Sequence, residues 1–377
     1  MQIKSKLPDV GTTIFTVMSK MASDHQAINL AQGFPNFPVD QRLVDQIANN
    51  LNKPYHQYAP MPGNPNLLLA LSELTEKHYG RQTPQEEILV CAGATQAIYT
   101  AIQALVHPGE EVIIIDPAYD CYDPAVRMAG AKAVHIPMLV GFEMDWDRIE
   151  QSIHEQTRML IVNNPHNPSG RVFRQSDVEA LRSIMQKHPH LLLLSDEVYE
   201  YISFDEAHHS AHELKEFRDR ILVVSSFGKS FHITGWKLGY LISDEALMKE
   251  IKKVHQFLVF SVNNLAQQSL ADYLNLIDLS ELAGFYKQKR DHFAGLIAPG
   301  RFRLLPSEGT YFQALDYSEI SKEKDTEFVQ RMVREHGVAA IPMSAFYASE
   351  NHDRVIRLCF AKDEETLEKA AEKLCRI

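Results

Sequence analysis

Short apolar runs alternate with longer segments of helical periodicity through the middle of the chain. The apolar runs predict buried strands near residues 88–91, 112–115, 133–136, 159–162, 191–194, 221–224 and 238–242. Between most of them, apolar residues recur at the spacing of an amphipathic helix. Strands alternating with helices form a mostly parallel sheet that is covered on both faces and binds its ligands at the carboxyl ends of the strands. We therefore predict an α/β fold.

The pattern changes after this region. We expect helices near 246–259, 264–275 and 281–297, strands near 301–305, 310–315 and 355–360, and further helices near 326–336 and 364–374. Pro299-Gly300 follows the longest of these helices and favours a boundary. Together these segments predict a smaller α+β domain beside the large one. The predicted division is an N-terminal arm with part of the small domain (1–45), a large domain (46–280) and a C-terminal small domain (281–377).

Charge and length favour a protein that acts on small molecules. The 377 residues carry 38 basic and 49 acidic side chains, a net charge of −11 without long blocks, which argues against nucleic acid or an anionic membrane as the main partner. No stretch approaches the roughly 18 apolar residues of a membrane span, and the first residues lack the apolar core of a secretion signal. We expect a cytoplasmic protein.

Cysteine and histidine give no sign of a metal site. The four cysteines, at 91, 121, 359 and 375, form no CxxC pair and are interpreted as reduced thiols. No HExxH motif occurs among the 17 histidines. The cluster His208, His209 and His212 lies in a polar stretch that we interpret as a loop. We therefore predict no bound metal.

Lys229 is the leading candidate for chemistry. It lies between two predicted strands, among Ser226, Ser230 and several glycines, with a second cation at Lys237. Burial and a neighbouring cation disfavour the charged amine, and the neutral amine is the nucleophile that condenses with aldehydes. An ordinary surface lysine is the alternative. If the aldehyde is pyridoxal 5′-phosphate (PLP), the chain must also supply a phosphate cradle, a carboxylate for the pyridine nitrogen and donors for the ring oxygen.

Three further positions are suited to these tasks, each with a structural alternative. A strand enters a helix at Gly93-Ala94-Thr95, where free helix amides can hold a phosphate, although a tight turn explains the pattern equally well. Asp196 closes an apolar run and can serve a ligand or cap a turn. Arg357 lies within an apolar strand, where its charge needs either an internal carboxylate or that of a ligand.

Over nearly its whole length the chain resembles the fold-type I, PLP-dependent aminotransferases of class I/II, which share the aspartate aminotransferase fold. The motifs that carry this resemblance are Asn-Pro-His-Asn-Pro-Ser-Gly at 164–170, Ser-Asp-Glu-Val-Tyr at 195–199, Ser-Phe-Gly-Lys at 226–229 and Gly-Trp-Lys-Leu-Gly at 235–239. Within the class it is most similar to bacterial methionine aminotransferases and to the kynurenine/glutamine aminotransferase branch, through the stretches 12–16, 32–35, 57–60 and 255–263.

The resemblance implies roles for individual residues around the cofactor. Lys229 would bind PLP covalently and move the substrate's proton, Asp196 would pair with the pyridine nitrogen, and Tyr119 would stack on the ring. The ring oxygen would accept hydrogen bonds from Asn167 and Tyr199. The phosphate would be held by Ala94, Thr95, Ser226 and Lys237 of the same chain. Tyr58 of the partner subunit would also contact it. Many members of the family have arginine in place of Lys237, and a lysine loses the two-pronged fork while keeping the charge.

For the substrate, the resemblance implies recognition of the α-carboxylate by Arg357, Asn167 and the amide of Gly33. Phe15 and Phe260 would contribute to an aromatic, uncharged side-chain pocket. The stretch 257–264 has no arginine, whereas dicarboxylate-specific relatives place a second one there. The expected activity is transfer of the amino group from methionine, or from an aromatic or neutral amino acid, to a 2-oxo acid by a homodimer with shared active sites.

One other enzyme activity stays open at this point, and one class of regulator is disfavoured. The same fold and the same lysine would serve a PLP-dependent cysteine-S-conjugate β-lyase, which cleaves a carbon–sulfur bond. A regulator that senses a ligand through this domain would carry a winged-helix module before it, and the roughly 30 residues ahead of Gly33 leave no room for one.

Overall fold

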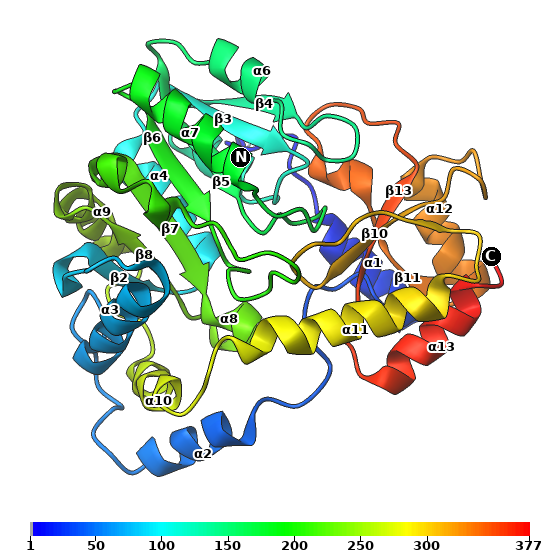
Figure 1. Ribbon diagram of the computed structural model, residues 1–377, viewed down its shortest axis with the longest axis horizontal. Helices are drawn as coiled ribbons and strands as arrows, with labels where there is room; N and C mark the ends of the chain where they lie inside the picture. The colour runs from blue at the N-terminus through cyan, green and yellow to red at the C-terminus, as the bar shows by residue number, and fades with distance from the viewer. Residues whose placement is uncertain (1–2) are drawn as a thin grey trace.

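The computed structural model describes residues 3–377 and contains a large domain built on one seven-stranded sheet (Figure 1). Along the sheet the strands are ordered β2-β8-β7-β6-β5-β3-β4. β8 pairs antiparallel with both of its neighbours, and the other pairs, from β7 to β4, are parallel. The seven strands are β2 (Ile88–Cys91), β3 (Glu111–Asp116), β4 (Lys132–Pro137), β5 (Thr157–Asn163), β6 (Leu192–Asp196), β7 (Ile221–Ser226) and β8 (Gly239–Ser243).

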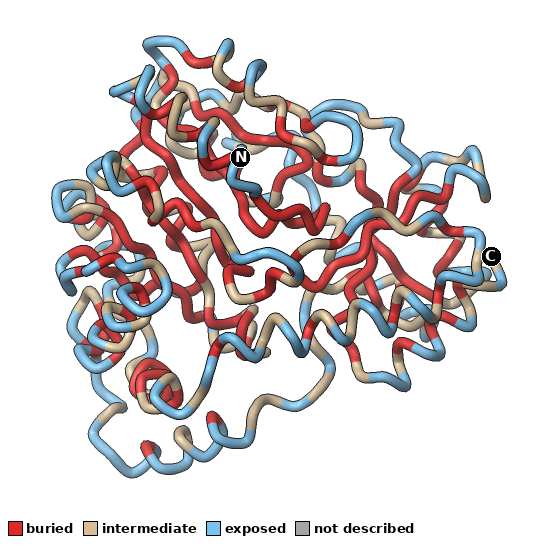
Figure 2. The backbone as a smooth tube through the Cα atoms, viewed as in Figure 1, coloured by how far each residue is buried: buried red, intermediate tan, exposed pale blue. Residues whose placement is uncertain are grey.

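Helices cover both faces of this sheet, as the alternating pattern predicts. Adjacent residues of β6 point to opposite faces: Leu194 packs in the core beneath α4 and α9, whereas Leu193 packs in the core beneath α6 and α7. Both cores are buried (Figure 2). The large-domain helices are α3 (Pro65–Tyr79), α4 (Ala94–Leu105), α5 (Tyr122–Met128), α6 (Trp146–Gln151), α7 (Gln175–Lys187), α8 (Phe227–Ser230), α9 (Glu245–Leu258) and α10 (Asn264–Leu274).

A second, smaller sheet lies at the other end of the molecule, and the long helix α11 connects the two parts (Figure 1). Its order is β12-β13-β10-β9, with all pairs antiparallel. The strands of this sheet are β9 (Arg303–Leu304), β10 (Phe312–Asp316), β12 (Ile341–Pro342) and β13 (Val355–Cys359). The remaining helices are α1 (Ile14–Asp24), α2 (Gln41–Asn50), α11 (Glu281–Ile297), α12 (Asp325–Arg331) and α13 (Glu364–Leu374).

The beginning of the chain joins the small sheet region through a short parallel pair, β1 (Ile28–Asn29) with β11 (Val338–Ala339). These strands and β12 have two residues each, too short for any periodicity in the sequence. The helix expected near 326–336 is α12 followed by a π-helical turn, Met332–His336. The predicted domain boundaries after residues 45 and 280 stay predictions. Among residues 3–377, no helix is both long enough and apolar enough to span a bilayer.

The two domains meet through main-chain contacts at Gly170 and Gly309. The amides of Glu308 and Gly309 both donate to the carbonyl of Gly170 at 2.8 Å, and Thr310 N donates to Ile202 O at 2.8 Å. A Cβ atom on Gly309 would lie 2.7 Å from a methyl carbon of Val172 and 2.8 Å from Ile202 O, so only glycine fits there. This junction holds the start of β10 against the loop that follows β5.

We expect Gly309→Ala to lower the free energy of unfolding by about 1–3 kcal/mol, because the added methyl group forces the two loops apart. Gly295→Ala is the matched control, since Gly295 lies in α11 and a Cβ atom added there would meet no neighbouring atom within 4 Å. An alanine in a helix interior is favoured over glycine by about 0.5–1 kcal/mol. Urea unfolding of both variants measures the difference, and equal stability would contradict the close packing at Gly309.

Candidate active site

One cavity lies at the carboxyl ends of β5, β6 and β7, where a mostly parallel sheet is expected to bind its ligand. Its volume is about 660 Å³, counting the space at its mouth. Nine of the residues singled out in the sequence line it: Ala94, Thr95, Tyr119, Asn167, Asp196, Tyr199, Ser226, Lys229 and Lys237. They come from strand ends and loops that lie far apart in the chain, so the fold gathers the predicted site.

Lys229 lies on α8, the single helical turn that follows β7. The hydroxyl of Ser226 caps this turn by accepting a hydrogen bond from Gly228 N at 3.2 Å. The Lys229 ammonium nitrogen lies 5.8 Å from the ring centre of Tyr199 and 6.0 Å from that of Tyr311. Burial, followed by the charge of Arg357, lowers the pKa of Lys229 to about 8. Lys237, the cation that the sequence suggested as its neighbour, has a smaller effect than Arg357.

The start of α4 forms one wall of the cavity and is suited to an anion. Gly93 precedes the helix with φ of 81° and supplies no side-chain cap, so the first amides of α4 have no partner within the helix. A Cβ on Gly93 would lie 3.3 Å from the Lys237 ammonium nitrogen. A Cβ on Gly239 would lie 3.0 Å from Ala94 N. Two glycines thus allow strand, helix and cation to meet at one point.

Asp196 faces the cavity from the end of β6 and is 3% exposed. Its Oδ2 accepts a hydrogen bond from the hydroxyl of Tyr122 at 2.5 Å, and Oδ1 accepts one from Val198 N at 3.3 Å. Burial raises the pKa of Asp196 to about 6, and the Tyr122 hydrogen bond acts in the opposite direction. The carboxylate therefore serves as more than a turn cap, because one oxygen is held by a side chain from α5. Tyr122 was not among the predicted residues.

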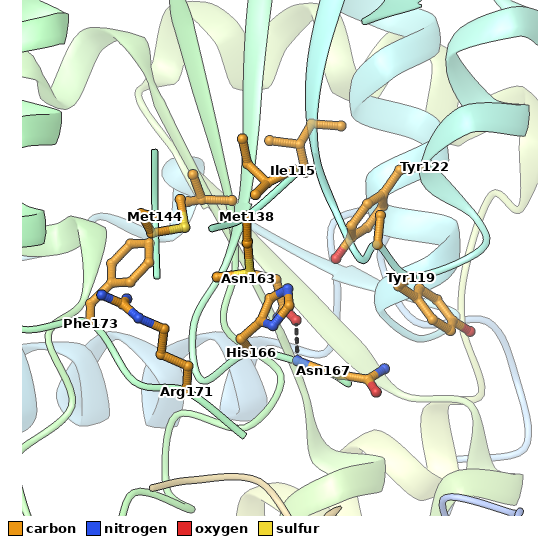
Figure 3. A pocket seen from close by; sticks show the side chains of 13 residues that line it. Ile115, Tyr119, Tyr122, Met138, Met144, Asn163, His166, Asn167, Arg171 and Phe173 are labelled. Atoms are coloured by element: carbon orange, nitrogen blue, oxygen red, sulfur yellow. Dashed lines mark hydrogen bonds between the residues drawn. The ribbon is translucent and has the colours of Figure 1, made fainter. Parts of the chain in front are cut away.

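Asn163 is a second residue that the sequence analysis missed. Its Oδ1 accepts a hydrogen bond from Asn167 N at 2.7 Å, drawn as a dashed line in Figure 3, and its Nδ2 donates to Asp196 O at 2.8 Å. Asn163 is paired with Asp196 in the register of β5 and β6. The small hollow in Figure 3 lies directly beside the cavity and shares Tyr119, Asn163 and Asn167 with it. One side chain thus fixes two of the predicted cofactor-binding loops.

His166 joins the loops that carry Tyr119 and Asn167. Its Nε2 donates to Pro117 O at 3.0 Å, and its Nδ1 accepts from the hydroxyl of Ser169 at 2.7 Å. Burial lowers the pKa of His166 to about 4, so the ring stays neutral with the proton on Nε2. The loop after β3 and the loop after β5 are therefore held in a fixed relation.

Arg357 lies beside the cavity in the middle of β13 and is 1% exposed. Its Nη1 donates to Asn167 Oδ1 at 2.7 Å and its Nη2 to Ala31 O at 3.1 Å. Within residues 3–377 no carboxylate lies within 4.0 Å of the guanidinium, and its Nε has no hydrogen-bond partner. Of the two alternatives for this charge, an internal carboxylate is wrong for the described residues, and a ligand carboxylate stays a prediction.

Aromatic rings surround this guanidinium. Its central carbon lies 3.9 Å from the ring centre of Phe312, 5.0 Å from that of Phe346 and 5.4 Å from that of Phe15. Phe15 was predicted here, whereas Phe312 and Phe346 were not. Gly33 also lies close by, since its added Cβ would meet Phe312 at 2.8 Å. If the carboxylate of an amino acid bound at Arg357, the side chain of that amino acid would lie among aromatic rings.

Tyr58 and Phe260 lie outside the cavity of this single chain. Their rings pack edge to face with centres 5.4 Å apart, and they are 80% and 47% exposed. Phe260 follows α9 with φ of 66°, a backbone conformation that residues other than glycine rarely adopt. Phe257, three residues earlier, is 88% exposed. Their predicted roles therefore depend on a second subunit and stay predictions.

Comparison with known proteins places the chain in a family. The profile of the family Aminotransferase class I and II matches residues 25–374. The chain belongs to this family. It is 46% identical over 378 residues to the methionine aminotransferase of Escherichia coli strain K12, covering 98% of this chain and 97% of that protein. It is 31% identical over 414 residues to the kynurenine–oxoglutarate transaminase of Dictyostelium discoideum, covering 97% and 94%.

A solved structure supports the same assignment for the fold. An Escherichia coli protein identified as having a methionine aminotransferase function superposes with a TM-score of 0.97 at 45% identity, and the match covers all of both chains. The aminotransferase fold predicted from the motifs is therefore confirmed.

We expect Tyr122→Phe to raise the pKa of Asp196 further above its value of about 6, because the buried carboxylate loses its hydroxyl donor while the protonated form loses little. With the higher pKa, Asp196 should stay protonated to a higher pH in the variant than in the unaltered protein. A carbon-13 NMR titration of labelled aspartate, assigned with Asp196→Asn, measures the midpoint. An unchanged midpoint would show that Tyr122 does not stabilise the ionised carboxylate.

Proposed function

We propose that this protein is a PLP-dependent aminotransferase that moves the amino group of methionine, or of an aromatic or other uncharged amino acid, to a 2-oxo acid. The observation that carries the proposal is the placement of the Lys229 amine in the same cavity as the Asp196 carboxylate and the free amides of α4. The family match and the 46% identity to a methionine aminotransferase support it. The proposal places the protein in the cytoplasm.

The residues of the cavity fit PLP. The amides of Ala94 and Thr95, the Ser226 hydroxyl and the Lys237 ammonium group would hold the phosphate at the start of α4. The Asp196 carboxylate, with one oxygen kept by Tyr122, would accept a hydrogen bond from the ring nitrogen. Asn167 would bind the ring oxygen through its Nδ2, because its Oδ1 is already occupied by Arg357. The second donor would be Tyr199, and Tyr119 would cover the ring.

Lys229 is the group that moves protons in this proposal. When bound, PLP supplies an electron-poor ring that stabilises negative charge at the substrate's Cα. Lys229 would hold the cofactor covalently at rest and, once displaced by the substrate amine, would take the proton from Cα with its Nζ. A lysine with a pKa of about 8 has a sizeable neutral fraction near neutral pH, as this task requires.

Arg357 would bind the substrate's α-carboxylate and so place Cα near Lys229. A guanidinium with Nε free and no carboxylate within 4.0 Å among the described residues is prepared for a bidentate pair. The rings of Phe15, Phe312 and Phe346 would then face the amino acid's side chain. Sulfur–aromatic contacts contribute roughly 0.3–1.5 kcal/mol, whereas an unpaired second carboxylate among these rings is strongly disfavoured.

The proposal includes a homodimer with shared active sites. The exposed pair Tyr58 and Phe260, with the nearby Phe257, forms an aromatic surface that a second subunit would cover. Tyr58 of the partner subunit would then reach the phosphate, and Phe260 of the partner subunit would complete the side-chain pocket.

A half-reaction screen of the twenty amino acids and kynurenine tests the proposed function. We expect methionine to convert the bound cofactor to its amine form fastest, followed by the aromatic amino acids and glutamine. Aspartate should be a poor substrate, because its second carboxylate would lie among aromatic rings without a cation to pair with it. Loss of the cofactor's visible absorbance measures each rate. Lys229→Ala should take up no borohydride-reducible cofactor.

Three results would contradict the proposal in different ways. Faster conversion of aspartate than of methionine would overturn the substrate class. Pyruvate, ammonia and a thiol formed from a cysteine S-conjugate, without accumulation of the amine form, would favour the β-lyase activity instead. A reducible covalent adduct in Lys229→Ala would place the cofactor on another lysine.

Arg357→Ala should raise the apparent Michaelis constants for both the amino acid and the 2-oxo acid. The lost charge-assisted hydrogen bonds are worth roughly 1.5–3 kcal/mol, which corresponds to about a tenfold change or more. Steady-state kinetics with both substrates measures the effect, and Arg303→Ala, which alters a surface arginine of the same sheet, is the control. Unchanged constants for both substrates would leave Arg357 with a structural role alone.

A further inference from the structure

Two buried carboxylates lie among the cavity residues in the segment at the end of β6 and just after it. Asp196 and Tyr199 line the cavity, whereas Glu197 and Glu200 do not and are 0% and 5% exposed. The turn after β6 thus directs Asp196, Val198 and Tyr199 toward the cavity, and Glu197 and Glu200 away from it. One side belongs to the proposed cofactor site, and the other is a buried polar layer that the mechanism above does not use.

Glu200 joins this turn to three separate elements. Its Oε1 accepts hydrogen bonds from the hydroxyl of Ser225 and, at 2.8 Å, from that of Tyr240. Its Oε2 accepts one at 2.5 Å from the hydroxyl of Tyr79, at the end of α3. Every one of these donors is neutral, so no cation balances the carboxyl group directly among the residues described. Consistent with this, burial raises the pKa of Glu200.

The donors on β7 and β8 lie directly behind the walls of the cavity. Ser225 precedes Ser226 on β7, and adjacent strand residues point to opposite faces. Tyr240 follows Gly239 on β8, the glycine that lies against Ala94 N. Glu200 therefore connects the turn that carries Tyr199 to β7, which carries Ser226, and to β8, which packs against the start of α4 through Gly239. A shift of Glu200 would change the distance between these two parts of the cavity.

Glu197 holds the next segment of chain against the same turn. Its Oε1 accepts hydrogen bonds from the Ser195 hydroxyl at 2.7 Å and from Ala211 N at 2.9 Å, and its Oε2 binds His208 Nε2 at 2.8 Å. The stretch around His208 was interpreted as a polar loop. It is a loop that turns a histidine inward to meet this carboxylate, and the described residues show no cluster of groups that could hold a metal.

We propose that Glu200 is a positioning residue for the reaction, which sets the place of Tyr199 relative to Ser226 and Lys229 through its hydrogen bonds to β7 and β8. A hydrophobic side chain would fill the same space without directed bonds to three elements. The inference rests on the proposed function, because Tyr199 needs a fixed place only if it binds a cofactor. Glu197 supports the same turn from its other side.

Glu200→Gln tests this proposal, since the amide keeps the volume and one acceptor oxygen but presents a donor where a second acceptor was. We expect kcat to fall about tenfold or more, the apparent Michaelis constant for methionine to stay within about twofold because Arg357 is untouched, and the absorption maximum of bound PLP to shift. The affinity of the cofactor-free protein for PLP, measured by fluorescence, should fall as well.

Asp316→Asn is the matched control. Asp316 is also buried and loses a carboxylate to an amide, but it lies at the far end of β10, where it contacts Arg303 and Ser318. It should lower Tm without changing the PLP spectrum or kcat. If Glu200→Gln behaves in the same way as Asp316→Asn, Glu200 has a structural role and the proposal is overturned.

Two further outcomes separate the role of Glu200 from the proposed function. If Glu200→Gln does not fold, Tyr79→Phe removes one donor only and should shift the absorption maximum of bound PLP from that of the unaltered protein, and an unchanged maximum would overturn the proposal. If the unaltered protein binds no PLP, the proposed function fails and the role of Glu200 fails with it. Binding of PLP by the unaltered protein together with an unchanged variant would contradict the role of Glu200 alone.

Discussion

The buried charge of Arg357 is the constraint on which the site depends. A guanidinium in the interior of β13 is costly without an anion, and the only polar groups bonded to it among the described residues are the Asn167 amide oxygen and the Ala31 carbonyl. Three aromatic rings have their centres within 5.4 Å of its central carbon. The fold therefore keeps a charge that only two neutral oxygens bind among the described residues, and the same charge helps to lower the pKa of Lys229.

Side chains at the strand ends form hydrogen bonds that connect Arg357 to the large sheet. β5 and β6 end at the paired residues Asn163 and Asp196, and Asn163 also binds the amide of Asn167, which in turn meets Arg357. A continuous set of hydrogen bonds thus runs from the large sheet to the small one. In this set the register of β5 and β6 places Asn163 and Asp196, and the loop residue Asn167 is held by its bonds to Asn163 and Arg357.

The sequence predicted the strands of the large sheet and the charged residues with unusual surroundings. It missed the neutral side chains that position these charged residues. Apolar runs located all seven strands of the large sheet, while β1, β11 and β12 have too few residues to show a period. Asp196 and Arg357 stood out because a charge at the end of or within an apolar run demands an explanation, and Lys229 because it lies between two predicted strands among serines and glycines. Asn163 and Tyr122 carry no such signal, although Asn163 ends its strand as Asp196 does, and the parallel register could have paired them.

The charges around the cavity also connect stability with function. Lys229 and the α4 terminus present positive charge or dipole to the cavity, Arg357 lies beside it, and Asp196 is the carboxylate among the residues that line it. Like charges held close together destabilise a fold unless an anion joins them. A phosphate at α4 and a carboxylate at Arg357 would each relieve part of this repulsion, and any ligand that binds only the native state adds its binding free energy to the free energy of unfolding. The positive charges that would bind an anionic cofactor and an amino acid carboxylate thus lower the stability of the free protein, and each bound anion would restore part of it.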